Sequence, residues 1–207
     1  MNAPTRVMLR PIGNPLPLGF LALAGATLLV SGLQLGWLSS SDGKDVALIL
    51  IAFVFPLQLV TAVFGYLGRD VVAGTGMGIL SGTWLSVGLV TLTSPAGSTS
   101  DGLGLFLLLA AVAILVPALA AATGKLVAVA VLGTTALRFA CTGIYQLTAS
   151  GTWEDIAGLV GLALCAVAVY AALAIALEDA RRTTVLPTGR RGIGRDVEDE
   201  AGIRAQL

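Results

Sequence analysis

The chain has 207 residues, of which 56% are hydrophobic and only 12% are charged. A soluble domain carries about a quarter charged residues, so this composition argues against a water-soluble fold. Basic and acidic residues are equal in number and the formal net charge is zero. The chain therefore lacks the basic surface that binding to nucleic acid requires.

Six apolar runs follow a short lead at residues 1–13. Each run has the length of about 20 residues that a helix needs to cross about 30 Å of hydrocarbon. We place the runs at 15–38, 46–67, 71–92, 103–123, 126–147 and 153–177. The runs are too long for barrel strands and do not alternate. They predict an all-α integral membrane fold over residues 14–178, a bundle of six transmembrane helices. We expect the polar tail at 179–207 to be partly disordered.

The basic residues predict the orientation of this bundle. On one side Lys44 stands alone among acidic residues, whereas the other side holds Arg69, Lys125 and the arginines of both chain ends. Because Lys and Arg collect on the cytoplasmic side, both termini are expected to be cytoplasmic. The protein is then a multi-pass protein of the cell membrane.

The first apolar run opens on a proline-rich segment at residues 14–20. Pro15 and Pro17 suit a helix entrance, where the first N–H groups have no partner within the helix. Asn14 is expected to cap those groups with its side-chain oxygen. The segment is either a start signal for a membrane helix or a helix N-terminus presented to a small anion at one end of a pore.

The third run carries Gly74, Gly78 and Gly82 at a spacing of four residues. This spacing predicts a flat strip for helix packing, where a second backbone can approach closely. Leu80 points away from the strip and is free to face a pore.

Polar residues recur along two of the runs and predict the wall of a pore. The stripes are Thr134, Arg138, Thr142 and Gln146 in the fifth run, and Thr27, Ser31 and Gln34 in the first. The second run adds Gln58 and Thr61, whereas the fourth and sixth have almost nothing polar at mid-depth. We therefore expect the first, second, third and fifth spans to line a route, and the other two to face lipid or other subunits.

Arg138 is the most costly residue of the predicted bundle. An arginine at mid-depth costs at least about 2.5 kcal/mol and must face protein or water. It either forms a structural pair, for which Glu154 and Asp155 are the nearest outer carboxylates, or attracts an anion. The sequence leaves both interpretations open.

The chain contains no histidine, and no predicted span has a carboxylate at mid-depth, so the usual proton relays of transporters are missing. Transport coupled to protons would require the substrate to cross as a neutral acid; the alternative is a channel for the anion. Catalytic sets of Ser/His, Cys/His or paired carboxylates cannot be assembled either. We expect no enzyme, no cofactor and no metal site.

Two segments resemble the acetate uptake transporter family, the bacterial succinate–acetate permeases and their fungal relatives. Residues 14–20, Asn-Pro-Leu-Pro-Leu-Gly-Phe, resemble the family's Asn-Pro-Ala-Pro-Leu-Gly-Leu signature. Residues 184–189, Thr-Val-Leu-Pro-Thr-Gly, are similar to its Thr-Val-Leu-Pro-x-Gly tail. The resemblance spans residues 14–189.

The resemblance implies a homohexamer in which every subunit has six helices around its own pore and moves acetate or, in some members, succinate. It implies a substrate-binding role for Asn14, Pro15, Pro17, Leu18 and Gly19. The family's constriction of Phe, Tyr and Leu maps onto Leu23, Leu80 and a residue near Leu132 or Gly133. Neither aromatic is kept, and a neck reshaped in this way, beside an added positive charge, also suits another small monocarboxylate.

We therefore expect a permease or channel for small carboxylates, acetate first. One alternative is a channel for a small neutral solute such as urea or glycerol, because most of the predicted wall is uncharged. A second alternative is a non-transporting membrane scaffold or sensor that acts through the basic C-terminal tail.

Overall fold

The computed structural model describes residues 13–122, 124, 126–181 and 183–189, and within these residues it is helical, with no strand. The α-helices are α1 (Leu16–Gln34), α2 (Gly43–Ile49), α3 (Phe55–Leu67), α4 (Val71–Thr93), α5 (Asp101–Ala121), α6 (Leu126–Thr148) and α7 (Gly151–Arg181). A short 3-10 helix, η1 (Ser40–Asp42), precedes α2, and a π-helical segment, η2 (Leu50–Val54), joins α2 to α3.

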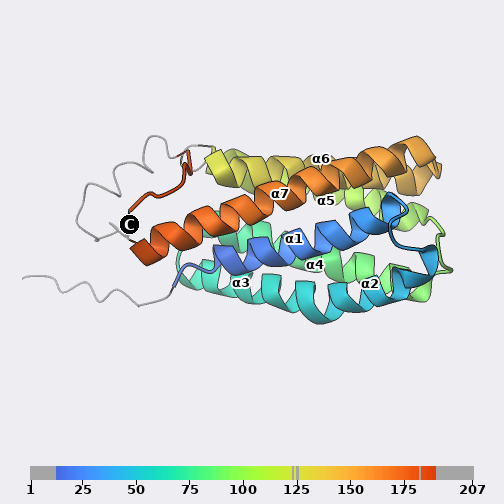
Figure 1. Cartoon of the computed structure of the whole chain (residues 1–207), viewed down its shortest axis with the longest axis horizontal. Helices are drawn as coiled ribbons and strands as arrows, with labels where there is room; N and C mark the ends of the chain where they lie inside the picture. Colours follow the sequence, from blue (N-terminus) through green and yellow to red (C-terminus); the bar gives the residue numbers. More distant parts are fainter. Residues whose placement is uncertain (1–12, 123, 125, 182, 190–207) are drawn as a thin grey trace, which may run out of the picture.

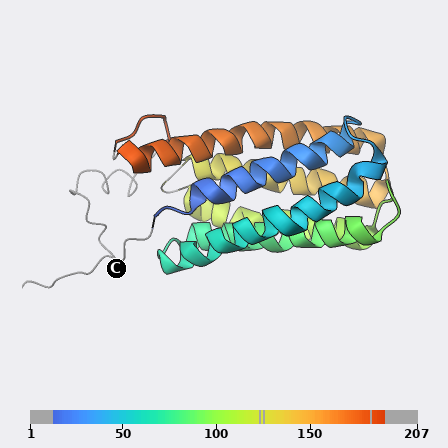
Figure 2. The same ribbon diagram turned by 60° about the horizontal axis from the view of Figure 1, so that its bottom comes forward.

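These elements make six helices that are long and apolar enough to cross a membrane, which confirms the predicted six-helix membrane fold. The second of them runs unbroken through four elements, as Ser40–Leu67. The helices lie side by side along one axis, and the described residues at both chain ends lie at the same end of the bundle (Figures 1 and 2). The side of the membrane that this end faces stays a prediction. Residues 1–12 and 190–207 lie outside the described residues.

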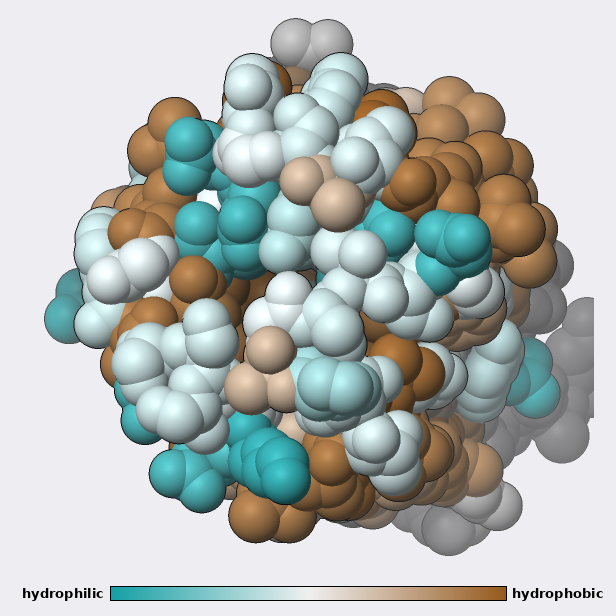
Figure 3. All heavy atoms as spheres, turned by 90° about the vertical axis from the view of Figure 1, so that its right-hand side faces the viewer, coloured by the Kyte–Doolittle hydropathy of each residue, from teal (hydrophilic) through white to brown (hydrophobic). Residues whose placement is uncertain are grey.

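The opposite end of the bundle, which we call the outer end, carries the loops that follow α1, α4 and α6. Figure 3 looks onto this end: polar residues cover much of the end face, and apolar residues cover the sides. Leu105, Leu109, Val116 and Leu119 of α5 are among the large apolar side chains exposed on the sides. A bundle surrounded by hydrocarbon requires this distribution, because polar groups are costly there.

The first helix ends earlier than the apolar run suggests. Gly36 adopts a left-handed φ of 69°, and the N–H groups of Trp37 and Leu38 turn back to the carbonyl oxygen of Gly32. This is the way a helix commonly ends at glycine. The apolar residues up to Leu38 therefore form a turn, and α1 stops at Gln34.

The second span widens into the π-helical segment directly before Pro56. Proline has no N–H, and its ring clashes with the carbonyl group four residues earlier in a regular helix. A wider turn relieves this clash and aims Leu50 and Val54 into the bundle, where both are buried.

The glycine strip of α4 packs against α3 over part of its length. A Cβ on Gly65 would lie 2.7 Å from the backbone nitrogen of Gly74, so the two helices nearly touch there. Farther along, a Cβ on Gly78 would lie 3.8 Å from Cβ of Ala62. Gly82 differs, because it is exposed and nothing lies within 4 Å of the position of its Cβ. The subunit does not use Gly82 for packing between its own helices.

Candidate functional site: two cavities and the barrier between them

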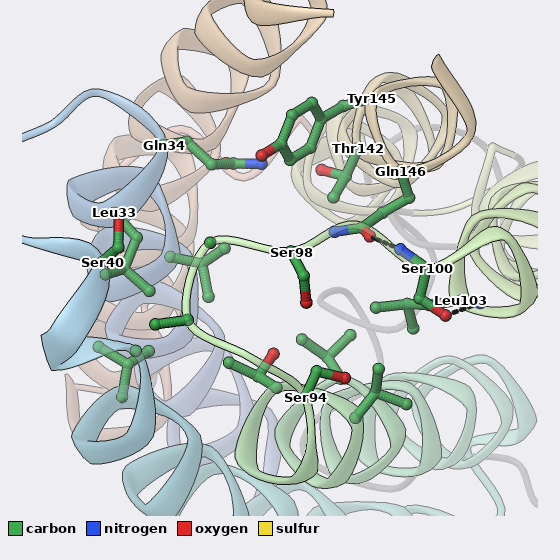
Figure 4. A pocket seen from close by; sticks show the side chains of 18 of the residues that line it. Leu33, Gln34, Ser40, Ser94, Ser98, Ser100, Leu103, Thr142, Tyr145 and Gln146 are labelled. Atoms are coloured by element: carbon green, nitrogen blue, oxygen red, sulfur yellow. Dashed lines mark hydrogen bonds between the residues drawn. The ribbon is translucent and has the colours of Figure 1, made fainter. Parts of the chain in front are cut away.

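A cavity of about 140 Å³, whose lining includes many polar residues, lies at the outer end of the bundle. Its polar lining residues come from α1, η1, α2, α4, the loop before α5, α6 and α7: Gln34, Ser40, Lys44, Thr91, Ser94, Ser98, Ser100, Thr142, Tyr145, Gln146 and Glu154. Figure 4 shows many of these side chains arranged around an open centre. Leu50, Leu103 and Leu107 are among its apolar lining residues.

Only some of the polar side chains of this outer cavity have a hydrogen-bond partner among the described residues. Oε1 of Gln146 accepts a hydrogen bond from the backbone N–H of Ser100 at 2.8 Å. The buried hydroxyl group of Thr142 has no partner within the described part of the chain. The lining includes one basic residue, Lys44, and one acidic residue, Glu154, so these two charges offset each other.

A second cavity of about 190 Å³ lies toward the end of the bundle that holds the described chain ends. It is mostly apolar and is lined by Leu16, Phe20, Asp70, Val72, Ala73, Gly76, Met77, Ala120, Ala121, Gly124, Ala128 and Leu132. Asp70 is the one charged residue of this lining within the described part of the chain, and its carboxylate caps α4 by accepting from the N–H of Ala73 at 2.9 Å. We call this the inner cavity.

The two cavities share no lining residue. On three helices their nearest lining residues are ten positions apart: Phe20 and Val30 on α1, Met77 and Val87 on α4, and Leu132 and Thr142 on α6. Ten residues of α-helix rise about 15 Å. Each of the three helices thus gives the same separation, and the barrier between the cavities is about 15 Å long.

The barrier is filled by large buried side chains from facing helices. Leu23 of α1 and Leu80 of α4 are fully buried and line neither cavity. Beside them Trp84 and Phe139 meet edge to face, with ring centroids 5.8 Å apart. Leu132 lies at the inner boundary of the barrier, against Gly76. The structure therefore brings the three expected constriction residues to one stretch of the bundle and adds an aromatic pair that the analysis of the sequence did not include.

The barrier also holds polar groups without a partner. Both amide atoms of Gln58 and Nε1 of Trp84 are buried and make no hydrogen bond within the described residues. Two contacts between α3 and α4 show how deep in the bundle Gln58 lies. The hydroxyl group of Ser81 donates to the carbonyl oxygen of Phe55, and Ala62 faces Gly78. Gln58 lies between these contacts and is therefore level with Leu80.

Arg138 is buried beside this barrier, at 1% exposure, and turns toward α1 and α7. Its Nη1 donates to Oγ of Ser31 at 2.8 Å and to the carbonyl oxygen of Ala157 at 3.2 Å. Its Nη2 donates to Oε1 of Gln34 at 3.3 Å. Within the described residues it has no carboxylate partner, so pairing with Glu154 or Asp155 is not what holds it.

Gly161 of α7 makes the room for this guanidinium group. A Cβ at Gly161 would overlap Nη1 and Cζ of Arg138 and Oγ of Ser31. This feature cannot be predicted from the sequence, because a glycine in a span has many packing roles and only the fold shows what faces it.

A sequence model of the GPR1/FUN34/yaaH family matches residues 2–190. The chain belongs to this family. Among solved structures, it is similar to one described as the bacterial acetate channel SatP, with a TM-score of 0.75 and 25% identity over 86% of this chain and 99% of that chain. A comparison with curated proteins gave no match. The predicted membership of the acetate uptake transporter family and the multi-pass membrane fold are therefore confirmed.

The amino-terminal signature of this family member fixes α1 against α3 and α4. Oδ1 of Asn14 accepts from the N–H of Leu16 at 3.1 Å, which caps the helix as expected. The carbonyl oxygen of Pro15 accepts from the hydroxyl group of Thr61 at 3.4 Å. A Cβ on Gly19 would lie 2.6 Å from Sδ of Met77 and 2.8 Å from Cγ2 of Thr61, so a larger residue at this crossing would require these side chains to move.

The signature reaches the inner cavity through the two positions at which it departs from the family pattern. Leu16 and Phe20 line that cavity, whereas Asn14, Pro15, Pro17, Leu18 and Gly19 do not. Leu18 is 40% exposed and lines neither cavity. A substrate-binding role of the five matched residues thus stays a prediction, and the structure shows a role in positioning α1 for Asn14, Pro15 and Gly19.

The expected polar stripes divide between the outer cavity, the protein interior and, for Thr134, a half-exposed position. Gln34 and Thr142 line the outer cavity, whereas Thr27, Ser31, Thr134 and Arg138 line neither cavity. Thr27 and Thr134 instead donate to the backbone carbonyl oxygens of Ala24 and Ala130. A threonine hydroxyl within a helix can always bond to its own backbone in this way, and its periodicity alone does not show which partner it takes.

The expectation that the fourth and sixth spans only face lipid or other subunits is wrong. Leu103 and Leu107 of α5 and Glu154 of α7 line the outer cavity, and Ala120 and Ala121 of α5 line the inner one. The search for polar residues missed α5 because its contributions to both cavities are apolar.

The tail signature closes the end of the bundle near the inner cavity. The N–H groups of Leu126 and Val127 at the start of α6 donate to the carbonyl oxygens of Gly189 and Thr188, each at 3.2 Å. The hydroxyl group of Tyr170 on α7 donates to the carbonyl oxygen of Pro187 at 2.9 Å. The tail thus caps α6, whose first N–H groups have no partner within the helix.

Proposed function

We propose that this protein is a membrane channel or permease for small carboxylates, with acetate as the first candidate. The route in each subunit runs from the outer cavity, past Leu80 and Leu23, to the inner cavity. The observation that carries the proposal is the barrier of about 15 Å in which buried N–H donors have no partner among the residues that the structure describes. The structural likeness to a bacterial acetate channel supports it.

The chemistry of the barrier suits a small carboxylate. A buried polar group without a partner costs about 1–3 kcal/mol, and a passing solute that accepts hydrogen bonds relieves this cost. Gln58 and Trp84 supply N–H donors for the two oxygens of a carboxylate, and Leu23 and Leu80 supply an apolar wall for its methyl group. A hydrated cation finds no carboxylate among the described residues of the barrier.

The substrate crosses either as the anion or as the neutral acid. The chain has no histidine, so a proton taken up with the substrate has no imidazole relay to follow. We propose that any proton crosses on the carboxylate itself.

The assembly that the family resemblance implies is a homohexamer, and we retain it as a proposal. The exposed leucines and valines of α5, among them Leu109 and Leu119, then face lipid or a neighbouring subunit. Crosslinking of the purified protein followed by gel electrophoresis tests the number of subunits.

Uptake by liposomes tests the transport function. The purified protein is reconstituted, and uptake of labelled acetate, formate, lactate and succinate is compared with uptake by empty liposomes. We expect acetate to enter faster than succinate, because the barrier is narrow and apolar. Equal uptake by protein-containing and empty liposomes for all four acids would contradict the proposal.

The wall of the route carries few charges within the described residues, and this also suits a neutral solute such as urea or glycerol. Swelling of the same liposomes in these solutes, without any uptake of acetate, would favour this second candidate.

A further inference from the structure

The guanidinium group of Arg138 carries a charge that the described residues around it do not neutralise. Its acceptors are the side chains of Ser31 and Gln34 and the backbone carbonyl of Ala157, all of which are neutral. A charge buried in a membrane bundle is costly and marks function more often than structure. A neutral amide at this position would tie the same helices together without burying a charge.

This charge lies directly behind the wall of the outer cavity. Gln34, which accepts a hydrogen bond from Nη2 of Arg138, also lines that cavity. Thr142, one helical turn beyond Arg138 on α6, lines it as well. Lys44 and Glu154 offset each other in the lining, and the neighbouring carboxylates of Asp42, Asp45, Asp101 and Asp155 are exposed or half-exposed, so that water screens them. Among the described residues Arg138 is the one fully buried charge, and its field on the cavity is screened least.

We propose that Arg138 is a specificity-determining residue that makes the outer cavity select anions, so that the carboxylate enters in its ionised form. The residue acts through its electric field, because Gln34 stands between the guanidinium group and the cavity. This inference rests on the proposed function, that small carboxylates cross the protein, and adds the charge state in which they enter. For a separation on the order of 8 Å and an effective dielectric constant of about 20, the Coulomb energy of one unit charge corresponds to an enrichment of an anion on the order of thirtyfold.

Acetate and acetamide provide the test, because they have nearly the same shape and differ in charge. Liposomes containing the wild-type protein or the variant Arg138→Gln are compared for the ratio of acetate flux to acetamide flux. We expect this ratio to fall on the order of thirtyfold in the variant. The double variant Arg138→Gln/Thr142→Lys returns a cation to the edge of the same cavity and should recover much of the ratio.

A purely structural role of Arg138 predicts a different result. Both fluxes would then fall together, the ratio would stay constant, and Thr142→Lys would restore nothing; this outcome overturns the inference. The melting temperature of each variant in detergent is measured beside the fluxes to show how much folded protein is present.

The wild-type protein alone also tests the inference, in case Arg138→Gln does not fold. In a planar bilayer with a gradient of sodium acetate, the reversal potential should lie near the equilibrium potential of acetate. A potential near that of sodium, or the absence of a current beside normal uptake of acetic acid, overturns the inference while the proposed function stands. If the wild-type protein moves neither acetate nor acetamide, the proposed function itself has failed.

Discussion

Gly161→Ala should displace Arg138 without altering any charged residue. The added Cβ would overlap the guanidinium group and Oγ of Ser31. Since α6 and α7 are packed along their length, we expect the flexible arginine side chain to move rather than the helices. It then loses its hydrogen bonds to Ser31, Gln34 and Ala157.

The size of the effect follows from these three hydrogen bonds. An interhelical hydrogen bond in a membrane protein contributes about 0.6 kcal/mol on average, and a bond to a charged group contributes about 1.5 kcal/mol or more. Three bonds therefore give a loss of about 2–5 kcal/mol in the free energy of unfolding. For a chain of this size the loss corresponds to a fall in melting temperature of roughly 5–15 °C.

Thermal unfolding in detergent, followed by circular dichroism, measures this change. Gly25→Ala on α1 is the matched control, because nothing lies within 4 Å of the position of its Cβ. The control should melt at the wild-type temperature or slightly above it, because alanine favours a helix by about 0.5–1 kcal/mol over glycine. If Gly161→Ala melts together with Gly25→Ala, the three bonds add nothing to stability and the reasoning fails.

Three further changes test the barrier and the tail. Gln58→Leu should raise the free energy of unfolding by about 1–3 kcal/mol, because it removes a buried amide that has no partner among the described residues. It should also slow acetate uptake severalfold. A loss of stability, measured by thermal unfolding, would show that Gln58 has a partner in the folded protein. Leu80→Ala should lower the free energy of unfolding by about 2–5 kcal/mol and raise the uptake of lactate relative to that of acetate. The control Leu105→Ala, on the exposed face of α5, should leave this ratio unchanged. Equal ratios in the two variants would show that Leu80 does not line the route. Gly189→Ala should lower the melting temperature by several degrees, because this glycine has a φ of 65° and a Cβ there would lie 2.7 Å from Cβ of Leu126. A melting temperature equal to that of the wild type would show that the tail does not stabilise α6.

Much of the fold could be predicted from the sequence. The six spans, their order and the return of both described chain ends to one side all follow from the length of the apolar runs and the shortness of the connections. Arg138 was expected to face protein or water, and it lies inside the protein. Leu23 and Leu80 were singled out by resemblance, and both lie in the barrier between the cavities.

The neighbours of these residues could not be predicted. From the sequence, the partner of Arg138 could be a carboxylate or an anion in a pore. In the structure the side chain binds Ser31, Gln34 and the backbone carbonyl of Ala157 instead. The place of Gly161 beside it depends on the rotation of α7 about its own axis. The contribution of α5 to both cavities likewise depends on the rotation of that helix about its own axis, which its sequence does not indicate.

The sequence by itself determined what is local: the number of spans, their approximate ends and the depth of each residue along its helix. A bilayer has a fixed thickness and offers no hydrogen bonds to an open backbone, so these features follow from runs of neighbouring residues. Only the tertiary structure decided which face of each helix meets which partner. That choice depends on the packing of side chains far apart in the sequence, and the nearly uniform hydrophobicity of most of these helices leaves no stripe that would mark an inner face.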